Sequence, residues 1–144
     1  MHTYEDDVVA WASEQSRLLR AGRFDQLDID HIAEEIEDVG KSEQRELANR
    51  MAVLLIHLLK WTYQPERRGT SWESTIREQR RALARRLRKT PSLQGSLCDP
   101  DWWEDAWLDA RTGAASEADI GFDVFPSSCP WSASEVLDQD WLPS

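Results

Sequence analysis

The sequence predicts an all-α fold for a single domain of 144 residues. Three observations support this prediction. Apolar residues recur at helical spacing over the first ninety residues, capping and stop residues flank these stretches, and no stretch alternates apolar and polar residues as a strand would. We expect four main helices to form an antiparallel bundle over residues 1–90. A tryptophan-rich helical arm over residues 91–144 should pack on that bundle.

Two helices are predicted before residue 42. The first covers about residues 4–21, and Gly22 is its expected C-terminal stop. The second covers about residues 28–39 and should end at Gly40. The short loop between them predicts antiparallel packing.

Two further helices complete the predicted bundle. The third begins near Ser42 and continues through an apolar stretch until Pro65 interrupts it. The fourth begins at Thr70, which would form a capping box with Glu73, and ends before Pro91.

The last third of the chain carries weaker helix signals. Asp99 is a typical N-cap, and Pro100 follows it at the first helical position. The chain should loosen after Gly113. Ser132 and Glu135 form a second predicted capping box and begin a short final helix.

Tryptophan is unusually abundant, with eight residues against three Phe and two Tyr. Large rings of this kind favour a buried position, so we expect the arm to be part of the core, anchored by Trp131 and Phe125. The alternative is an exposed aromatic platform for bases, sugars or a peptide. Five tryptophans belong to the arm: Trp102, Trp103, Trp107, Trp131 and Trp141.

Charge is distributed in three blocks, within a formal net charge of -10. Residues 1–40 hold 3 basic and 11 acidic side chains, residues 41–90 hold 13 and 5, and residues 91–144 hold 1 and 11. We expect the blocks to neutralise one another when packed, within the monomer or a dimer. The acidic total argues against a nucleic-acid binder on bulk electrostatics alone.

Several classes of protein are disfavoured by what the sequence lacks. Cys98 and Cys129 have no C-x-x-C spacing, and no glycine-rich phosphate loop is present. The start shows no signal-peptide pattern, and no apolar run has the length of a membrane span. We therefore expect a cytoplasmic protein that does not enter a membrane.

A possible polar site lies on the second predicted helix. His31, Glu34 and Glu35 share adjacent turns there, and a His with an acid can bind a cation. A solvated acidic face is the alternative. His57 lies in an apolar stretch and needs a hydrogen-bond partner when buried. His31 and His57 could converge across the turn between the second and third helices, as ligands of a divalent metal or as a general base.

The fourth predicted helix is rich in arginine. Arg80 falls at the margin of the core and should need a buried carboxylate, for which Glu34 or Glu35 is the candidate. The other arginines form a stripe that could bind phosphates or pair with the acidic blocks. This stripe consists of Arg77, Arg81, Arg85 and Arg88.

Three stretches of the chain resemble a bacterial family known as domain-of-unknown-function family 29. These stretches are "YEDDVVAWASEQSRLLRAGRFDQLDIDHIAEEIEDVGKSEQREL", "LLIHLLKWTYQPERRGTSWESTIREQR" and "FPSSCPWSASEVLDQDWLP". The resemblance covers nearly the whole chain and implies an all-helical bundle without an assigned activity, so no catalytic residue is carried over. It extends to His31, Glu35, His57, Lys60, Trp61, Gln64, Pro65, Trp72, Glu78, Gln79 and Arg80.

Three functions are compatible with this sequence. The first is a non-enzymatic interaction or regulatory module that binds a protein partner or forms a homodimer, with no cofactor. The second is an acid–base or divalent-metal enzyme that uses His31, Glu34 or Glu35, and His57. The third is a nucleic-acid binder that uses the arginine stripe.

Overall fold

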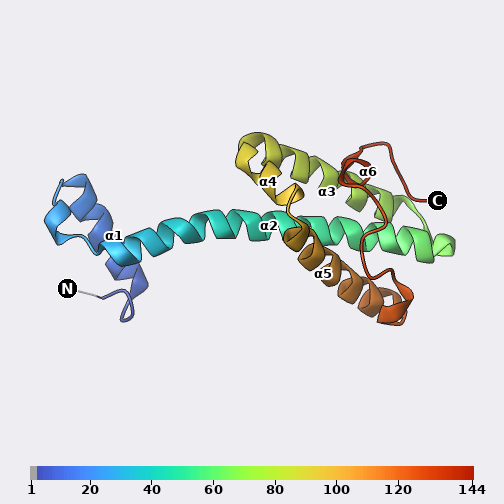
Figure 1. The fold of residues 1–144 in the computed structure, drawn as a ribbon, viewed down its shortest axis with the longest axis horizontal. Helices are drawn as coiled ribbons and strands as arrows, with labels where there is room; N and C mark the ends of the chain where they lie inside the picture. Colours follow the sequence, from blue (N-terminus) through green and yellow to red (C-terminus); the bar gives the residue numbers. More distant parts are fainter. Residues whose placement is uncertain (1–2) are drawn as a thin grey trace. The chain divides into compact units, whose positions relative to one another are not determined.

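A computed structural model of the chain describes residues 3–144, and this part is helical without any strand (Figure 1). The predicted all-α class is confirmed. By their internal contacts the residues group into two compact units, Met1–Ser42 and Glu43–Ser144. The helices are α1 (Val8–Arg20), α2 (Ile29–Tyr63), α3 (Thr70–Lys89), α4 (Gln94–Leu97), α5 (Pro100–Ala118) and α6 (Ala133–Leu137).

The second and third predicted helices form one continuous helix, α2, of 35 residues. The predicted stop at Gly40 is therefore wrong. A glycine inside a helix costs only about 1 kcal/mol relative to alanine, and residues 41–47 after it are mostly good helix formers with no proline. The four predicted bundle helices are consequently three.

In the first unit, α1 packs antiparallel to the first turns of α2. The Gln15 side chain accepts a hydrogen bond from the Asp28 backbone N–H, while Tyr4 reaches Glu35. Trp11 and Leu18 are the buried apolar residues of α1. Gly22, the predicted stop, follows the C-cap Ala21 and lies in the left-handed region at φ 73°.

In the second unit, α2 is the central helix and is buried on several sides. The ion pair between Arg86 and Glu43 places the end of α3 beside the start of this part of α2, so α3 runs antiparallel to α2. The Lys60–Glu117 pair lies near the end of both helices, and Trp102 donates to the Gln44 carbonyl near the start of both. Because these contacts follow the same order, α5 runs parallel to α2.

The C-terminal arm is part of this second core, as predicted. Phe125 and Val136 are 2% and 0% exposed, and the Phe125 ring meets Tyr63 of α2 edge to face. The Trp107 indole donates to the Pro126 carbonyl at 2.9 Å. Figure 1 shows the segment after α5 returning to lie beside α3 through α6.

The predicted caps are confirmed at two helices and wrong at a third. Asp99 caps α5 by accepting from the Asp101 N–H, and Ser132 with Glu135 forms the capping box of α6. The N-cap of α3 is Gly69, without a side-chain hydrogen bond, so the predicted capping box at Thr70 does not form.

Gly113 does not end α5, contrary to the sequence prediction. The helix continues to Ala118 and ends at Asp119, which has a left-handed φ of 54°. A Cβ at Gly113 would lie 2.5 Å from Cδ1 of Ile56, so the glycine allows α5 to approach α2 closely. None of the helices in residues 3–144 has the length and apolar character needed to cross a membrane.

Candidate functional site

The predicted polar cluster on α2 is centred on His31. Its Nδ1 lies 2.8 Å from Oδ2 of Asp28, and its Nε2 lies 3.2 Å from Oε1 of Glu5. The Trp11 indole donates to the same Asp28 oxygen at 2.9 Å. The imidazole therefore joins α2 to the segment before α1.

Tyr4 completes this cluster. Its ring stacks on the His31 imidazole, with centroids 4.3 Å apart, and its hydroxyl donates to the Glu35 carboxylate. That hydrogen bond raises the pKa of Tyr4 to about 12. Within the described residues Glu34 forms no ion pair, so of the two predicted acids only Glu35 joins the cluster, through its hydrogen bond with Tyr4.

Electrostatics favour a protonated His31. The hydrogen bond to Asp28 raises the pKa of His31, with a further increase from the charge of Glu5, and the same bond lowers the pKa of Asp28. An imidazolium that donates to two carboxylates is a poor general base, because its proton is held by both neighbours. The cluster is thus suited to linking helices.

His57 lies elsewhere on α2 and has a different role. It is half-buried, and its Nδ1 lies 2.9 Å from the Val53 carbonyl oxygen one turn earlier. The turn that was predicted to bring His31 next to it does not exist, because both residues belong to one continuous helix. In residues 3–144 no group of three or more His, Cys, Asp or Glu side chains is arranged to hold a metal ion.

Arg80 is buried, as predicted, but its partner is a backbone carbonyl. The side chain is 2% exposed, and Nε donates to the Val136 carbonyl at 2.8 Å. Within the described residues Arg80 forms no ion pair, so the predicted pairing with Glu34 or Glu35 is not found. Burial lowers the pKa of Arg80, and the charge of Asp138 opposes that shift. Arg80 thus joins α6 to α3.

Within one chain the arginine stripe is not neutralised, and its neutralisation across a dimer stays a prediction. All four stripe residues are exposed, and none forms an ion pair within the described residues. Within residues 3–144, one ion pair joins the basic block (residues 41–90) to the acidic block that follows it (residues 91–144). In this pair Nζ of Lys60 lies 2.8 Å from Oε1 of Glu117. Charge totals in the sequence could not reveal this outcome, because an ion pair requires two side chains within reach of each other.

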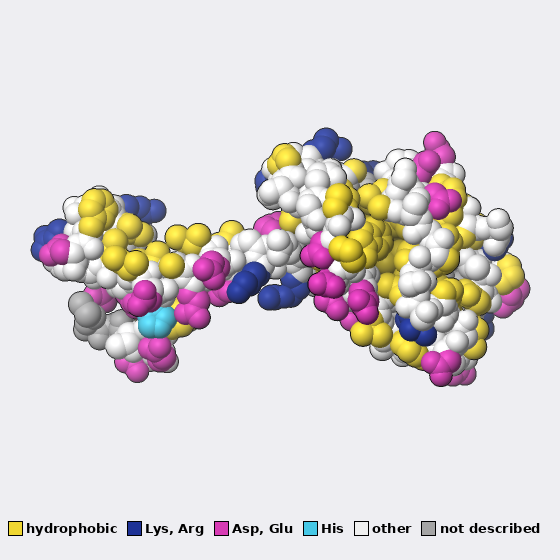
Figure 2. All heavy atoms as spheres, in the orientation of Figure 1, with side chains coloured by type: hydrophobic (Ala, Val, Ile, Leu, Met, Phe, Trp, Pro, Cys, Tyr) yellow, Lys and Arg dark blue, Asp and Glu magenta, His cyan; other side chains and the backbone are white. Residues whose placement is uncertain are grey.

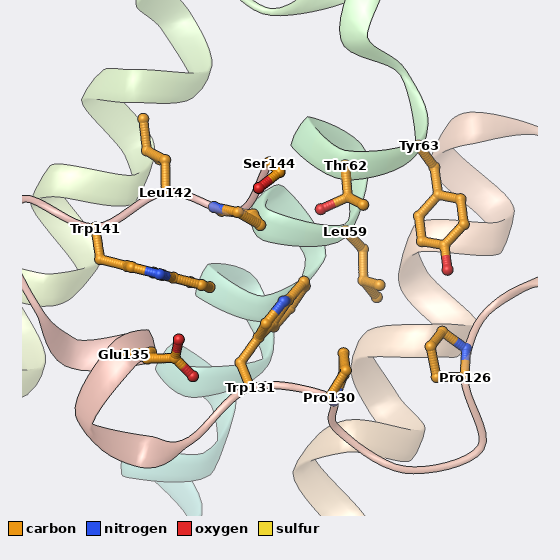
Figure 3. A pocket seen from close by; sticks show the side chains of 11 residues that line it. Leu59, Thr62, Tyr63, Pro126, Pro130, Trp131, Glu135, Trp141, Leu142 and Ser144 are labelled. Atoms are coloured by element: carbon orange, nitrogen blue, oxygen red, sulfur yellow. The ribbon is translucent and has the colours of Figure 1, made fainter.

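The tryptophans of the arm both seal the core and line cavities. One cavity has a volume of about 460 Å³ and is lined by Leu59, Tyr63, Trp131 and Trp141 among others. In Figure 3, Leu59 of α2 lies between Tyr63 and Trp131, and Trp141 lies on the other side of Trp131. A second cavity, of about 530 Å³, shares Trp131 and includes Trp107. Trp131 meets Trp107 and Trp141 edge to face, with centroids 5.9 and 5.8 Å apart. This contact chain supports the predicted sealing role.

The first unit exposes an apolar surface on α1 and the first turns of α2. Figure 2 shows hydrophobic side chains gathered over α1 and the first turns of α2. A shallow groove of about 290 Å³ between these helices is lined largely by apolar atoms, including those of Ala12, Leu19 and Ile32. The first unit also exposes seven large apolar residues by 45–77%, namely Val8, Val9, Leu19, Phe24, Ile29, Ile36 and Val39. We refer to this surface as the N-terminal apolar face.

Comparison with known proteins identifies the family. The model of the family described as "Domain of unknown function DUF29" matches residues 3–142, so the chain belongs to that family. No curated protein and no solved structure matches the chain. The family description assigns no activity.

Proposed function

We propose that this protein is a non-catalytic interaction module whose N-terminal unit pairs with the same unit of a second copy. The observation that carries this proposal is the N-terminal apolar face. Burying it in a complex would contribute about 25 cal/mol of favourable free energy for each Å² of apolar surface removed from water. Contiguous exposed apolar patches of this kind usually mark interaction sites.

The spacing of the face favours another helical surface as the occupant. Its α2 residues follow a three–four repeat, which is the repeat of a coiled-coil seam. The positions beside the seam include the small residues Ala33 and Gly40, and nothing lies within 4 Å of a Cβ built at Gly40. The seam residues are Ile29, Ile32, Ile36 and Val39.

The charges beside the groove favour an antiparallel pair of identical units. Arg20 and Glu35 both line the groove. Arg20 lies toward the turn between the helices, while Glu35 lies at the level of Tyr4 at the other end. A two-fold antiparallel arrangement places Arg20 of each copy near Glu35 of the other, whereas a parallel arrangement places like charges together.

The test is the molar mass in solution. We expect light scattering to give a dimer for the wild-type chain, and a monomer for Ile36→Asp with its helical content retained. Val124→Asp is the matched control, because Val124 is 58% exposed and belongs to the second unit, against 66% for Ile36. This control should remain dimeric.

Two results would overturn the proposal. One is a wild-type chain that stays monomeric at about 100 µM, a concentration at which a specific interface with micromolar affinity is largely occupied. The other is an equal loss of the dimer in Ile36→Asp and Val124→Asp, which would place the contact outside the N-terminal apolar face.

A further inference from the structure

A basic pocket lies between α2 and α3 in the second unit. It has a volume of about 290 Å³. That is near the lower end of the range for small-molecule sites, which suits a compact group. Its polar lining comes from both helices and from the residue that ends α3, namely Glu43, Arg50, Arg85, Arg86, Lys89 and Thr90.

Two of the four cations in this pocket are already paired. Arg86 Nη1 lies 3.1 Å from Oε2 of Glu43, and its Nη2 lies 3.5 Å from Oε1 of Glu46. Nε of Arg50 lies 3.2 Å from the same Glu46 oxygen. These two arginines and two glutamates balance in charge and hold the wall of the pocket in place.

The other two cations have no partner. Arg85 and Lys89 are exposed, and neither forms an ion pair within residues 3–144. The buried Nε of Arg50 also lacks a hydrogen-bond acceptor of suitable geometry, despite its ion pair. The pocket therefore has an excess of two positive charges and an unused buried donor.

We propose that this pocket binds a phosphate monoester group. Such a group carries about -1.5 to -2 charges at pH 7 and three acceptor oxygens, which matches the excess charge of the pocket. Arg85 and Lys89 would supply charge-assisted hydrogen bonds, and the Thr90 hydroxyl a neutral one. Arg85 also belongs to the arginine stripe, so a longer anionic ligand could continue from the pocket along α3.

The first test uses inorganic phosphate as the probe. We expect NMR titration to shift the signals of Arg85, Lys89 and Thr90, while chloride at equal ionic strength leaves them unchanged. Lys89→Gln and Arg85→Gln should each weaken binding about tenfold, as for loss of a charged hydrogen bond. Glu43→Gln should tighten binding, because it removes a competing carboxylate.

Arg77→Gln is the matched control for these variants. It removes the same charge from the same helix and stripe but lies outside the pocket. We expect its affinity for phosphate to stay within twofold of wild type. Loss of binding equal to that of Arg85→Gln would overturn the pocket assignment, as would the absence of any phosphate-specific shift.

The second test distinguishes the two sources of the phosphate group. A single-stranded oligonucleotide with a 5′-phosphate is compared with the same strand lacking it, and inorganic phosphate is used as the competitor. Stronger binding of the phosphorylated strand, reversed by inorganic phosphate, identifies a nucleic-acid end as a source. Binding of inorganic phosphate alone identifies free phosphate compounds. If both strands bind equally and inorganic phosphate does not compete, the arginine stripe binds the phosphodiester backbone and the pocket does not bind a phosphate monoester. That result would overturn the proposal.

Discussion

The two units of this chain use the same helix in opposite ways. From Leu47 onward α2 is the centre of a core, with Leu54, Leu55 and Leu58 fully buried. In its first turns the same helix leaves Ile29 and Ile36 about two-thirds exposed. Both stretches carry apolar residues at helical spacing, so the periodicity alone does not distinguish them.

The difference lies in what covers each stretch. Around residues 47–61, apolar side chains of α3, α5 and the segment after α5 surround α2 and form one core cluster. In the first unit α1 contributes Trp11 and Leu18 to the interior, and the contacts around His31 are largely polar. We infer that an apolar stripe specifies a buried face but not which chain buries it.

The largest effect on stability is expected from truncating the chain after Ile120, which removes the last part of the arm. This truncation deletes Phe125 and Val136 from the core of the second unit and uncovers the apolar residues beneath them. We expect a loss of about 5 kcal/mol or more, since each large buried side chain is worth about 2–5 kcal/mol. Thermal unfolding followed by circular dichroism should show no cooperative transition. A wild-type transition in the truncated chain would contradict the packing of the arm.

A matched pair of phenylalanines gives a smaller and more specific comparison. Phe125→Ala should destabilise the second unit by about 3–5 kcal/mol, because the ring is 2% exposed and packs on Tyr63. Phe24→Ala should change monomer stability by no more than about 0.5 kcal/mol, because that ring is 65% exposed. Urea denaturation at a protein concentration that favours the monomer measures both. Similar losses in the two variants would show that the units do not differ in this way.

Local signals in the sequence predicted much of this fold. The turn at Gly22 and the caps at Asp99 and Ser132 depend on a few neighbouring residues, and all three are found. The predicted stops at Gly40 and Gly113 are wrong because the residues that follow each glycine still favour a helix. A glycine therefore marks a helix end only where the following residues do not continue the helix, as after Gly22.

The candidate site was less predictable than the fold. Asp28 precedes His31 by three residues, a spacing that brings their side chains together on a helix, so this pair could have been found from the sequence. The contacts of Glu5 and Tyr4 could not, because they depend on how the segment before α1 folds back. The carbonyl partner of Arg80 likewise comes from a residue 56 positions away.

The N-caps of α1 and α6 allow the two units to be compared through smaller stability losses, of about 1 kcal/mol. Ser132 caps α6 in the second unit, and Asp7 caps α1 in the first by accepting from the Ala10 N–H. Replacing either with alanine should cost about 0.5–2 kcal/mol. We expect Ser132→Ala to lower the global stability measured by denaturation. Asp7→Ala should instead increase amide hydrogen exchange in α1, with the second unit unaffected.

The smallest effect concerns the pH dependence of the first unit. The folded-state pKa of His31 is raised above its ordinary value of 6.5, so its stabilising contribution is complete below pH 6.5 and is lost as pH rises through the folded pKa. The folded-state pKa of Asp28 is lowered below 3.8, so its contribution is present above pH 3.8 and is lost as pH falls through that lower value. Amide exchange in α1, corrected for intrinsic rates, should therefore show the strongest protection between about pH 4 and 6.5.

Asp28→Asn separates the two contributions, because it keeps the size of the side chain and removes the charge. In this variant the amide oxygen at position 28 can still accept from His31, but the bond to a charged carboxylate, which contributes most to the raised pKa, is lost. An NMR titration of the ring protons should then give a lower pKa than in wild type, and protection in α1 should become less dependent on pH above 6.5. The Arg80–Val136 contact, which joins α3 and α6 in the second unit, should not change over the same range because arginine stays protonated. Protection in α1 that rises between pH 6 and 8 would contradict the sign of the His31 shift, since a protonated imidazole is what holds Asp28 and Glu5 together.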